Sequence, residues 1–264
     1  MDLNTVTGYR RARTRADLAL GPGERILGGG TWLYSEPQLD TTGLVDLTTM
    51  GWAPLTRTDE GLSIAATCTI AELLAHPDRP PLAVECANAL LASSTIWTVA
   101  TVGGNVCRAF AAAGMVALCA ALDGVALVWA PSGGGRHDYR IPVAELATGN
   151  GTTSLAPGEV LRALEIPARV LAARTAFRKI ALAELGRSGA VLTGRVDPGG
   201  EAVFVITAAT ASPTVLRYPA LPGAAALRAD VDAAVGYYTD PLGSADWRRQ
   251  VSGVLLEEIR QELA

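Results

Sequence analysis

Two glycine-rich turns are the parts of this chain best suited to binding a ligand. The first is Gly28-Gly29-Gly30-Thr31, directly after the apolar pair Ile26-Leu27, and the second is Thr101-Val102-Gly103-Gly104-Asn105. Glycine allows the backbone to approach a ligand closely, and successive N–H groups can point into one concavity, which suits a phosphate. Two such nests of N–H groups in one domain would suit a dinucleotide.

The common nucleotide motifs do not fit these turns. A Rossmann fingerprint that starts at Gly28 would need glycine at position 33, where the chain has Leu33. A P-loop would need a lysine within the turn, and the single lysine of the chain is Lys179. The alternative that both turns merely bend the chain therefore stays open at this point.

The composition predicts a globular protein without a nucleic-acid or membrane role. The 264 residues are 49% hydrophobic and 18% charged, with 22 basic and 26 acidic side chains and a formal net charge of −4. Such a balance is not that of a nucleic-acid-binding protein. No apolar run is long enough for a membrane span, and residues 1–4 do not resemble a signal peptide, so we expect a cytoplasmic protein.

Cysteine and histidine give no pattern of metal ligands. The four cysteines, Cys68, Cys86, Cys107 and Cys119, form no Cys-x-x-Cys pair, so we expect free and mostly buried thiols and neither zinc nor an iron–sulfur cluster. The two histidines lie in loop-like contexts and are expected at the surface.

Hydrophobic patterning predicts alternating strands and helices in the first two thirds of the chain. Strands are expected over 25–27, 44–47, 62–66, 125–129 and 160–166, and helices over 69–74, 82–91 and 115–122, with Thr69 as an N-cap.

The remainder of the chain has a different pattern. Three strands over 175–180, 190–196 and 202–208 precede a helix that Ser244 could cap, which predicts a small α+β domain. We place the boundary near Arg169, giving a first domain over 1–168, with a split into two subdomains near residue 54, and a second domain over 169–264.

The order of these motifs resembles one known family. The chain is similar to the medium, FAD-binding subunit of molybdenum hydroxylases, the family of carbon monoxide dehydrogenase and xanthine dehydrogenase. Thr101-Val102-Gly103-Gly104-Asn105 is its most specific match, and the tail around Trp247 is the weakest. The other matching segments are 28–31, 44–47, 61–69, 155–161, 165–167 and Phe177-Arg178-Lys179.

The resemblance implies an α+β fold with a two-part FAD-binding domain of the PCMH type. A small α+β domain with a three-stranded antiparallel sheet and helices follows it, and FAD is held without a covalent bond. The resemblance further implies cofactor-binding roles for Ile26, Leu27, Gly28, Gly29, Gly30, Thr31, Trp32, Leu33, Thr101, Val102, Gly103, Gly104, Asn105, Leu161 and Lys179.

One position departs from the family pattern. The family's aspartate after the second glycine loop, which helps to hold the cofactor, falls on Gly114. The loss of one charged hydrogen bond would weaken FAD binding by about one to two decades.

The resemblance implies an electron-transfer subunit of a larger enzyme. FAD would take electrons from an iron–sulfur subunit and pass them to an acceptor, in a hetero-oligomer that includes a molybdopterin-binding large subunit. Two alternatives remain. The first is a free-standing FAD-dependent oxidoreductase, for which Glu165, Tyr34 and Arg178 are candidate catalytic groups. The second is a degenerate, flavin-free scaffold subunit.

Overall fold

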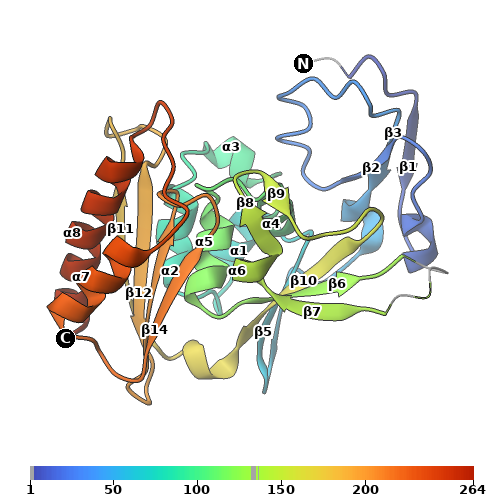
Figure 1. Cartoon of the computed structure of the whole chain (residues 1–264). Helices are drawn as coiled ribbons and strands as arrows, with labels where there is room; N and C mark the ends of the chain where they lie inside the picture. Colours follow the sequence, from blue (N-terminus) through green and yellow to red (C-terminus); the bar gives the residue numbers. More distant parts are fainter. Residues whose placement is uncertain (1–2, 132–134, 136) are drawn as a thin grey trace.

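The N-terminal part of the protein is a small parallel sheet. The computed structural model describes residues 3–131, 135 and 137–264, and Figure 1 shows its course. Strands β1 (Gly8–Arg11), β2 (Glu24–Leu27) and β3 (Gly43–Asp46) pair in the order β1-β3-β2. Two 3-10 helices, η1 (Arg15–Leu18) and η2 (Leu47–Met50), flank this sheet.

The predicted strand over 44–47 is displaced by one residue, since β3 spans Gly43–Asp46. Leu47 already begins η2, because the Asp46 carboxylate accepts a hydrogen bond of 2.9 Å from the Thr48 N–H and so caps that helix.

The central part combines an antiparallel sheet with short helices. The five strands pair in the order β4-β5-β10-β6-β7. Their bounds are β4 Leu55–Thr58, β5 Gly61–Ala65, β6 Val125–Trp129, β7 Tyr139–Pro142 and β10 Val160–Pro167. The helices and remaining short elements are α1 Ile70–Ala75, α2 Leu82–Asn88, α3 Ser94–Trp97, α4 Val102–Arg108, α5 Gly114–Ala121, α6 Val143–Leu146, β8 Ala147–Gly149, β9 Thr152–Thr153 and η3 Ala168–Val170.

Helix α5 lies at the centre of the molecule. All eight of its residues are buried, as expected for a helix that is apolar on every side. It packs against α2 on one side and against strands of the C-terminal sheet on the other (Figure 1). Gly114 allows the contact with α2, since a methyl group there would lie 2.1 Å from the carbonyl oxygen of Cys86.

The C-terminal part is a four-stranded antiparallel sheet covered by two helices. Its strands are β11 Arg174–Ile180, β12 Ala190–Val196, β13 Ala202–Thr207 and β14 Thr214–Tyr218, in sequential order. Helices α7 (Ala224–Ala233) and α8 (Ala245–Leu263) cover one face. The other face packs against α5.

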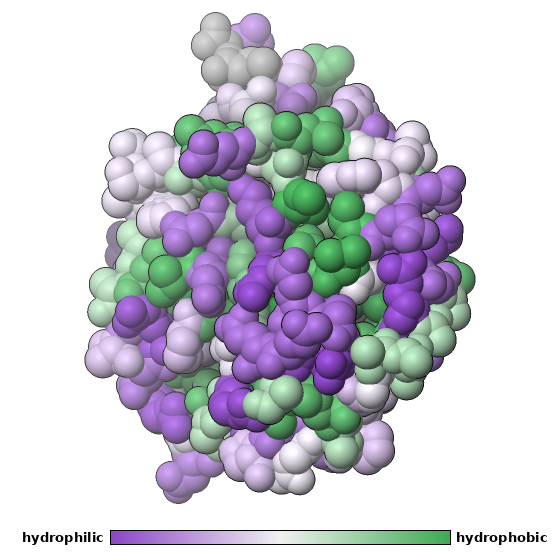
Figure 2. Space-filling view, turned by 90° about the vertical axis from the view of Figure 1, so that its left-hand side faces the viewer, coloured by the Kyte–Doolittle hydropathy of each residue, from purple (hydrophilic) through white to green (hydrophobic). Residues whose placement is uncertain are grey.

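Both faces of this sheet are apolar because each strand alternates between two cores. On β13, Phe204 and Ile206 pack with residues of α7 and α8, whereas Val203 and Val205 belong to the central core. Helix α8 turns its charged side outward, and the surface over α7 and α8 carries a broad hydrophilic area (Figure 2). No helix among the described residues is long and apolar enough to cross a bilayer.

The α+β class is confirmed, and so are several local predictions. Thr69 caps α1 in a reciprocal capping box with Glu72, and Ser244 caps α8 by accepting from the Trp247 N–H. The four cysteines are free, and three are buried, whereas Cys107 is exposed. The domain boundaries near residues 54 and 169 stay predictions.

Three further predictions differ from the structure. The C-terminal sheet has a fourth strand, β14, which the sequence analysis missed, together with α7. Helix α2 ends at Asn88 rather than at Leu91, which takes a left-handed conformation with φ of 53°. The second glycine segment is the first turn of helix α4 and not a loop.

An ion cluster around the buried pair of Asp123 and Arg195 joins the central helix to the C-terminal sheet. Asp123, just after α5, accepts hydrogen bonds from Arg195 (2.6 Å), Arg217 (2.6 Å) and Arg169 (2.5 Å). Arg195 is 1% exposed and also pairs with Asp197 at 2.8 Å. Burial alone would raise the pKa of Asp123, but the three guanidinium groups outweigh burial and hold this pKa well below its ordinary value.

We expect Asp123→Asn to lower the free energy of unfolding at neutral pH by about 3 kcal/mol, because Arg195 then loses a buried charged partner. Since the folded pKa of Asp123 is lowered, its contribution is complete above the unfolded pKa of about 3.9 and is lost as the pH falls below it. Urea unfolding at neutral and acidic pH measures this difference. The exposed Asp59→Asn is the control, and an equal effect of both variants would contradict the assignment.

Candidate functional site

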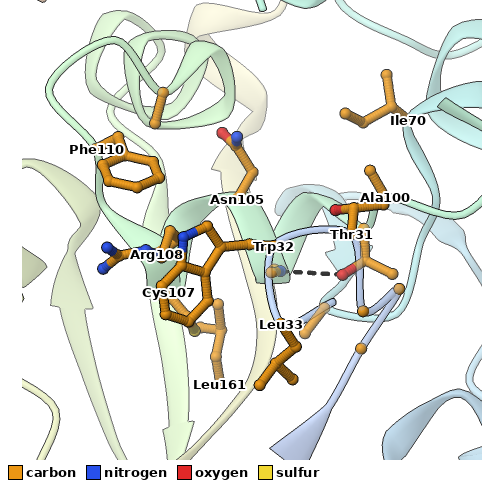
Figure 3. A pocket seen from close by; sticks show the side chains of 18 of the residues that line it. Thr31, Trp32, Leu33, Ile70, Ala100, Asn105, Cys107, Arg108, Phe110 and Leu161 are labelled. Atoms are coloured by element: carbon orange, nitrogen blue, oxygen red, sulfur yellow. Dashed lines mark hydrogen bonds between the residues drawn. The ribbon is translucent and has the colours of Figure 1, made fainter. Parts of the chain in front are cut away.

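A single large cavity brings together most of the residues predicted to bind the cofactor. Its volume is about 690 Å³, within the range of ligand pockets. Segments from all three parts of the chain line it: the loop after β2, the exposed side of α4, the α2–α3 connection, β10 and the segment before β12. Figure 3 shows the labelled side chains around this space. The predicted site residues on its wall are Ile26, Gly28, Gly29, Gly30, Thr31, Trp32, Leu33, Thr101, Gly103, Gly104, Asn105 and Leu161.

The first glycine loop packs directly on the backbone that precedes α4. A methyl group at Gly29 would lie 1.7 Å from the carbonyl oxygen of Val99, and one at Gly28 would lie 2.9 Å from Thr101 Oγ1. Gly30 has a positive φ of 72°, which favours glycine. These glycines are therefore needed for the contact between two segments of the wall, a reason that the sequence analysis did not give.

The first loop also offers free backbone donors. Within the described part of the chain, the N–H groups of residues 29–33 donate no hydrogen bond to a protein atom. The loop is closed instead by bonds from later residues, Tyr34 N–H to Gly30 O at 2.9 Å and Ser35 N–H to Trp32 O at 2.9 Å. A run of unpaired N–H groups on a cavity wall is suited to bind an anion such as a phosphate.

The second glycine segment does not offer the free N–H groups that were predicted for it. Its N–H groups are already used: Gly103 donates to Ala66 O at 3.0 Å, Gly104 to Thr101 Oγ1 at 3.0 Å and Asn105 to Thr101 O at 3.0 Å. Neither glycine has a positive φ. The prediction of a second nest of free N–H groups is therefore wrong.

Close packing explains why this helical turn contains glycine. A methyl group at Gly103 would lie 2.5 Å from the Cβ of Ala66 and 2.6 Å from its backbone, and one at Gly104 would lie 2.8 Å from the capping Thr101 Oγ1. The Asn105 Oδ1 accepts a hydrogen bond of 3.0 Å from the Met115 N–H and so holds the start of α5. The segment thus fixes the floor of the cavity.

The exposed side of α4 adds three side chains to the wall. Asn105, Cys107 and Arg108 are spaced as neighbours on one helix face, together with Gly104. Cys107 is open to the cavity but surrounded by protein on its other sides, and this burial raises the pKa of its thiol to about 12. The thiol is therefore protonated at neutral pH.

Both carboxylates on the cavity wall are already hydrogen-bonded. Glu24 pairs with Arg10 through two bonds of 2.8 Å, and this pair lowers the pKa of Glu24 to about 2. Glu159 accepts 2.8 Å bonds from Tyr139 Oη and from the Ala156 N–H. Neither group is placed as a free acid or base.

Three predicted residues do not line the cavity. Leu27 and Val102 are buried in the core beside it. Lys179 lies on β11 opposite Val191, where partial burial lowers its pKa. Cofactor-binding roles for these three residues stay predictions.

The three candidate catalytic groups are also not among the residues that line the cavity. Glu165 pairs with Arg140 at 2.7 Å, and Arg178 pairs with Glu258 at 3.0 Å and Glu262 at 2.7 Å. Tyr34 is 45% exposed at the protein surface. None of them is among the residues of the wall.

Gly114 does not face the cavity either. It is buried at the start of α5 against the carbonyl of Cys86 on α2, with room for no side chain. An aspartate at this position would have to separate two core helices before it could reach a ligand.

Several wall residues were not predicted from the sequence. The most informative are Arg108, Phe110, Arg187 and Ser188. Arg108 follows Gly104 by one helical turn, which would have signalled it had the segment been recognised as a helix. Arg187 and Ser188 come from the loop before β12, whose approach to the cavity has no local sequence signal. Among the described residues, no group of three or more His, Cys, Asp and Glu side chains could hold a metal ion.

Comparison with known proteins identifies a family and several structures of the same fold. Residues 11–169 match the family described as the FAD binding domain in molybdopterin dehydrogenase. Reconstituted CO dehydrogenase from Oligotropha carboxidovorans is 23% identical, with a TM-score of 0.85 over 100% of both chains.

Two further structures are similar over nearly their whole length. Carbon monoxide dehydrogenase from Hydrogenophaga pseudoflava, in a form lacking the Mo-pyranopterin moiety, is 19% identical, with a TM-score of 0.82 over 98% of this chain and 97% of that one. Quinoline 2-oxidoreductase from Pseudomonas putida 86 is 19% identical, with a TM-score of 0.78 over 100% of this chain and 98% of that one. No curated protein sequence matches the chain.

We expect Gly29→Ala to open the wall of the cavity, because the added methyl group would overlap the Val99 carbonyl. Overpacking of this kind costs about 1–3 kcal/mol of unfolding free energy and should also weaken FAD binding. Thermal unfolding and FAD titration measure the two effects. Gly199→Ala, which has open space around it, is the matched control. A Gly29→Ala protein with wild-type stability and affinity would show that the loop contact is dispensable.

Proposed function

The chain belongs to the family of FAD-binding domains of molybdopterin dehydrogenases, and from that premise we propose that it is the electron-transfer subunit of a molybdenum hydroxylase. Its cofactor is FAD, and it is an oxidoreductase subunit. In the proposed role it receives electrons from an iron–sulfur partner and delivers them through FAD to an acceptor.

The unpaired N–H groups of residues 29–33 are the observation that carries this proposal. A dinucleotide presents a pyrophosphate, and five consecutive free donors on a cavity wall fit such a group. The volume of about 690 Å³ is in the range of sites for ligands of this class. The residues present therefore fit FAD.

Different residues of the chain would bind different parts of FAD. The first loop would donate hydrogen bonds to phosphate oxygens, and Ile26, Leu33 and Leu161 provide apolar surface for the rings of the cofactor. The capped first turn of α4 holds the loop in place through the contacts of Gly28 and Gly29. FAD, when bound, supplies the redox chemistry.

The state of the polar groups in the wall favours electron transfer over acid–base catalysis. Glu24 and Glu159 are both engaged by protein donors, and the Cys107 thiol is protonated at neutral pH. A free-standing oxidoreductase would need a positioned acid or base. Glu165 and Arg178, considered for that role, are held in ion pairs elsewhere.

An apolar surface beside the cavity supports docking of a partner subunit. Leu182 and Leu185, in the loop between β11 and β12, are 67% and 85% exposed. The same loop leads to Arg187 and Ser188 on the cavity wall. We propose that an iron–sulfur subunit and a molybdopterin-binding large subunit complete the enzyme as a hetero-oligomer.

We expect the purified chain to bind one equivalent of FAD, with quenching of the fluorescence of Trp32, which lies on the cavity wall. Trp32→Phe should reduce this quenching, whereas Trp129→Phe, which removes an indole outside the wall, should not. Titration followed by absorbance and fluorescence measures both quantities. Absence of binding at about 1 mM FAD would contradict the proposal.

Co-expression with the neighbouring genes distinguishes an electron-transfer subunit from a free-standing FAD-dependent oxidoreductase. A subunit should copurify with an iron–sulfur protein and a molybdopterin-containing protein in size-exclusion chromatography. A chain that stays alone and oxidises a small metabolite with its own FAD would instead be the free-standing enzyme.

A further inference from the structure

Arg108 is a cation on the cavity wall that forms no ion pair with a carboxylate of the described residues, although the charge of Glu36 is near enough to act on it. Its guanidinium stacks over the rings of Trp32 and Phe110, at 4.1 Å from each ring centroid (Figure 3). Within the described part of the chain it donates one hydrogen bond, from Nη1 to the carbonyl of Gly151 at 3.2 Å. The Nε is buried and has no hydrogen-bond partner among the described residues.

The two fully buried arginines of the C-terminal part are neutralised by carboxylates. Arg195 pairs with Asp123 and Asp197, and Arg248 pairs with Asp240. Burial lowers the pKa of Arg108, and the charge of Glu36 offsets this effect only in part, so burial still disfavours the charged guanidinium. A desolvated cation with unused donors is expected to be compensated by an anion from outside the chain.

The position of Arg108 indicates which anion this is. Trp32 belongs to the loop whose N–H groups at residues 29–33 are free, and the Arg108 guanidinium stacks directly on its ring. Gly104, Cys107 and Arg108 share the side of α4 that faces the cavity. A charged fork and a row of backbone donors thus meet in one wall, and a guanidinium fork matches the geometry of a phosphate.

We propose that Arg108, held between Trp32 and Phe110, binds a phosphate group of the dinucleotide together with the N–H groups of the first glycine loop. This inference rests on the proposed function and deepens it by naming the charged residue of the site. Arg108 would supply a charged contact to the cofactor that Gly114 cannot supply.

The test compares FAD binding by the full chain and by Arg108→Gln, using calorimetry at low and high salt. Loss of one charged hydrogen-bonding group should weaken FAD binding about 10- to 100-fold. The weakening by salt should also be smaller in the variant, since fewer charged contacts remain to be screened.

Arg162→Gln is the matched control. Arg162 also stacks on an aromatic ring, that of Trp52 at 4.1 Å, and burial also lowers its pKa, but it does not line the cavity. Arg108→Lys keeps the charge without the planar fork, and should retain the salt dependence while binding FAD more weakly than the wild type. If Arg108→Gln does not fold, the FAD affinity of Arg108→Lys and its salt dependence test the proposal instead.

Each outcome is informative. If the wild type binds FAD and Arg108→Gln binds it within about two-fold as tightly, Arg108 is not a phosphate ligand. Equal weakening by Arg108→Gln and Arg162→Gln, or an unchanged salt dependence, would assign Arg108 to packing alone. If the wild type takes up no FAD at all, the proposed function fails and this inference fails with it.

Discussion

The site depends on one close contact between two backbone segments that are distant in sequence. The loop after β2 rests on the backbone before α4, with so little space that a single methyl group at Gly29 would overlap the Val99 carbonyl. This contact joins the N-terminal sheet to the central helices and forms one wall of the cavity. Among the described residues, the N–H groups of residues 29–33 have no protein partner, and the N–H groups of Tyr34 and Ser35 close the loop instead. The same loop therefore provides both the close packing contact and the row of free N–H groups.

The buried helix α5 supports this wall from the protein interior. Helix α5 is buried on every side, begins where Asn105 accepts from the Met115 N–H, and is followed by Asp123, which is bound by three arginines. The same helix therefore fixes α4 at one end and the C-terminal sheet at the other. Through this arrangement the loop before β12 reaches the cavity, although no strand of the C-terminal sheet lines it.

Much of the fold could be predicted from sequence, because its signals are local. The strands Val125–Trp129 and Ala190–Val196 have the predicted bounds because turn residues flank them. The capping residues Thr69 and Ser244 act as expected. The helical state of Thr101–Asn105 could not be predicted, since two glycines disfavour a helix and a long-range bond from Gly103 N–H to Ala66 O stabilises it. Arg108 was missed for the same reason, because its stacking partner Trp32 belongs to another part of the chain. The first loop, singled out by the resemblance to a family, lines the cavity, whereas Lys179 lies outside the wall, and the cofactor-binding role of both stays a prediction.

The central claim is that the free N–H groups of the first loop hold the phosphates of FAD. Amide hydrogen exchange of the full chain, with and without FAD, tests it most directly. The account predicts that the amides of residues 29–33 exchange readily without FAD and become protected when it binds. The amides of residues 103–105 should change little, since they are already hydrogen-bonded within the protein. Bound FAD with unchanged exchange at residues 29–33 would contradict the account.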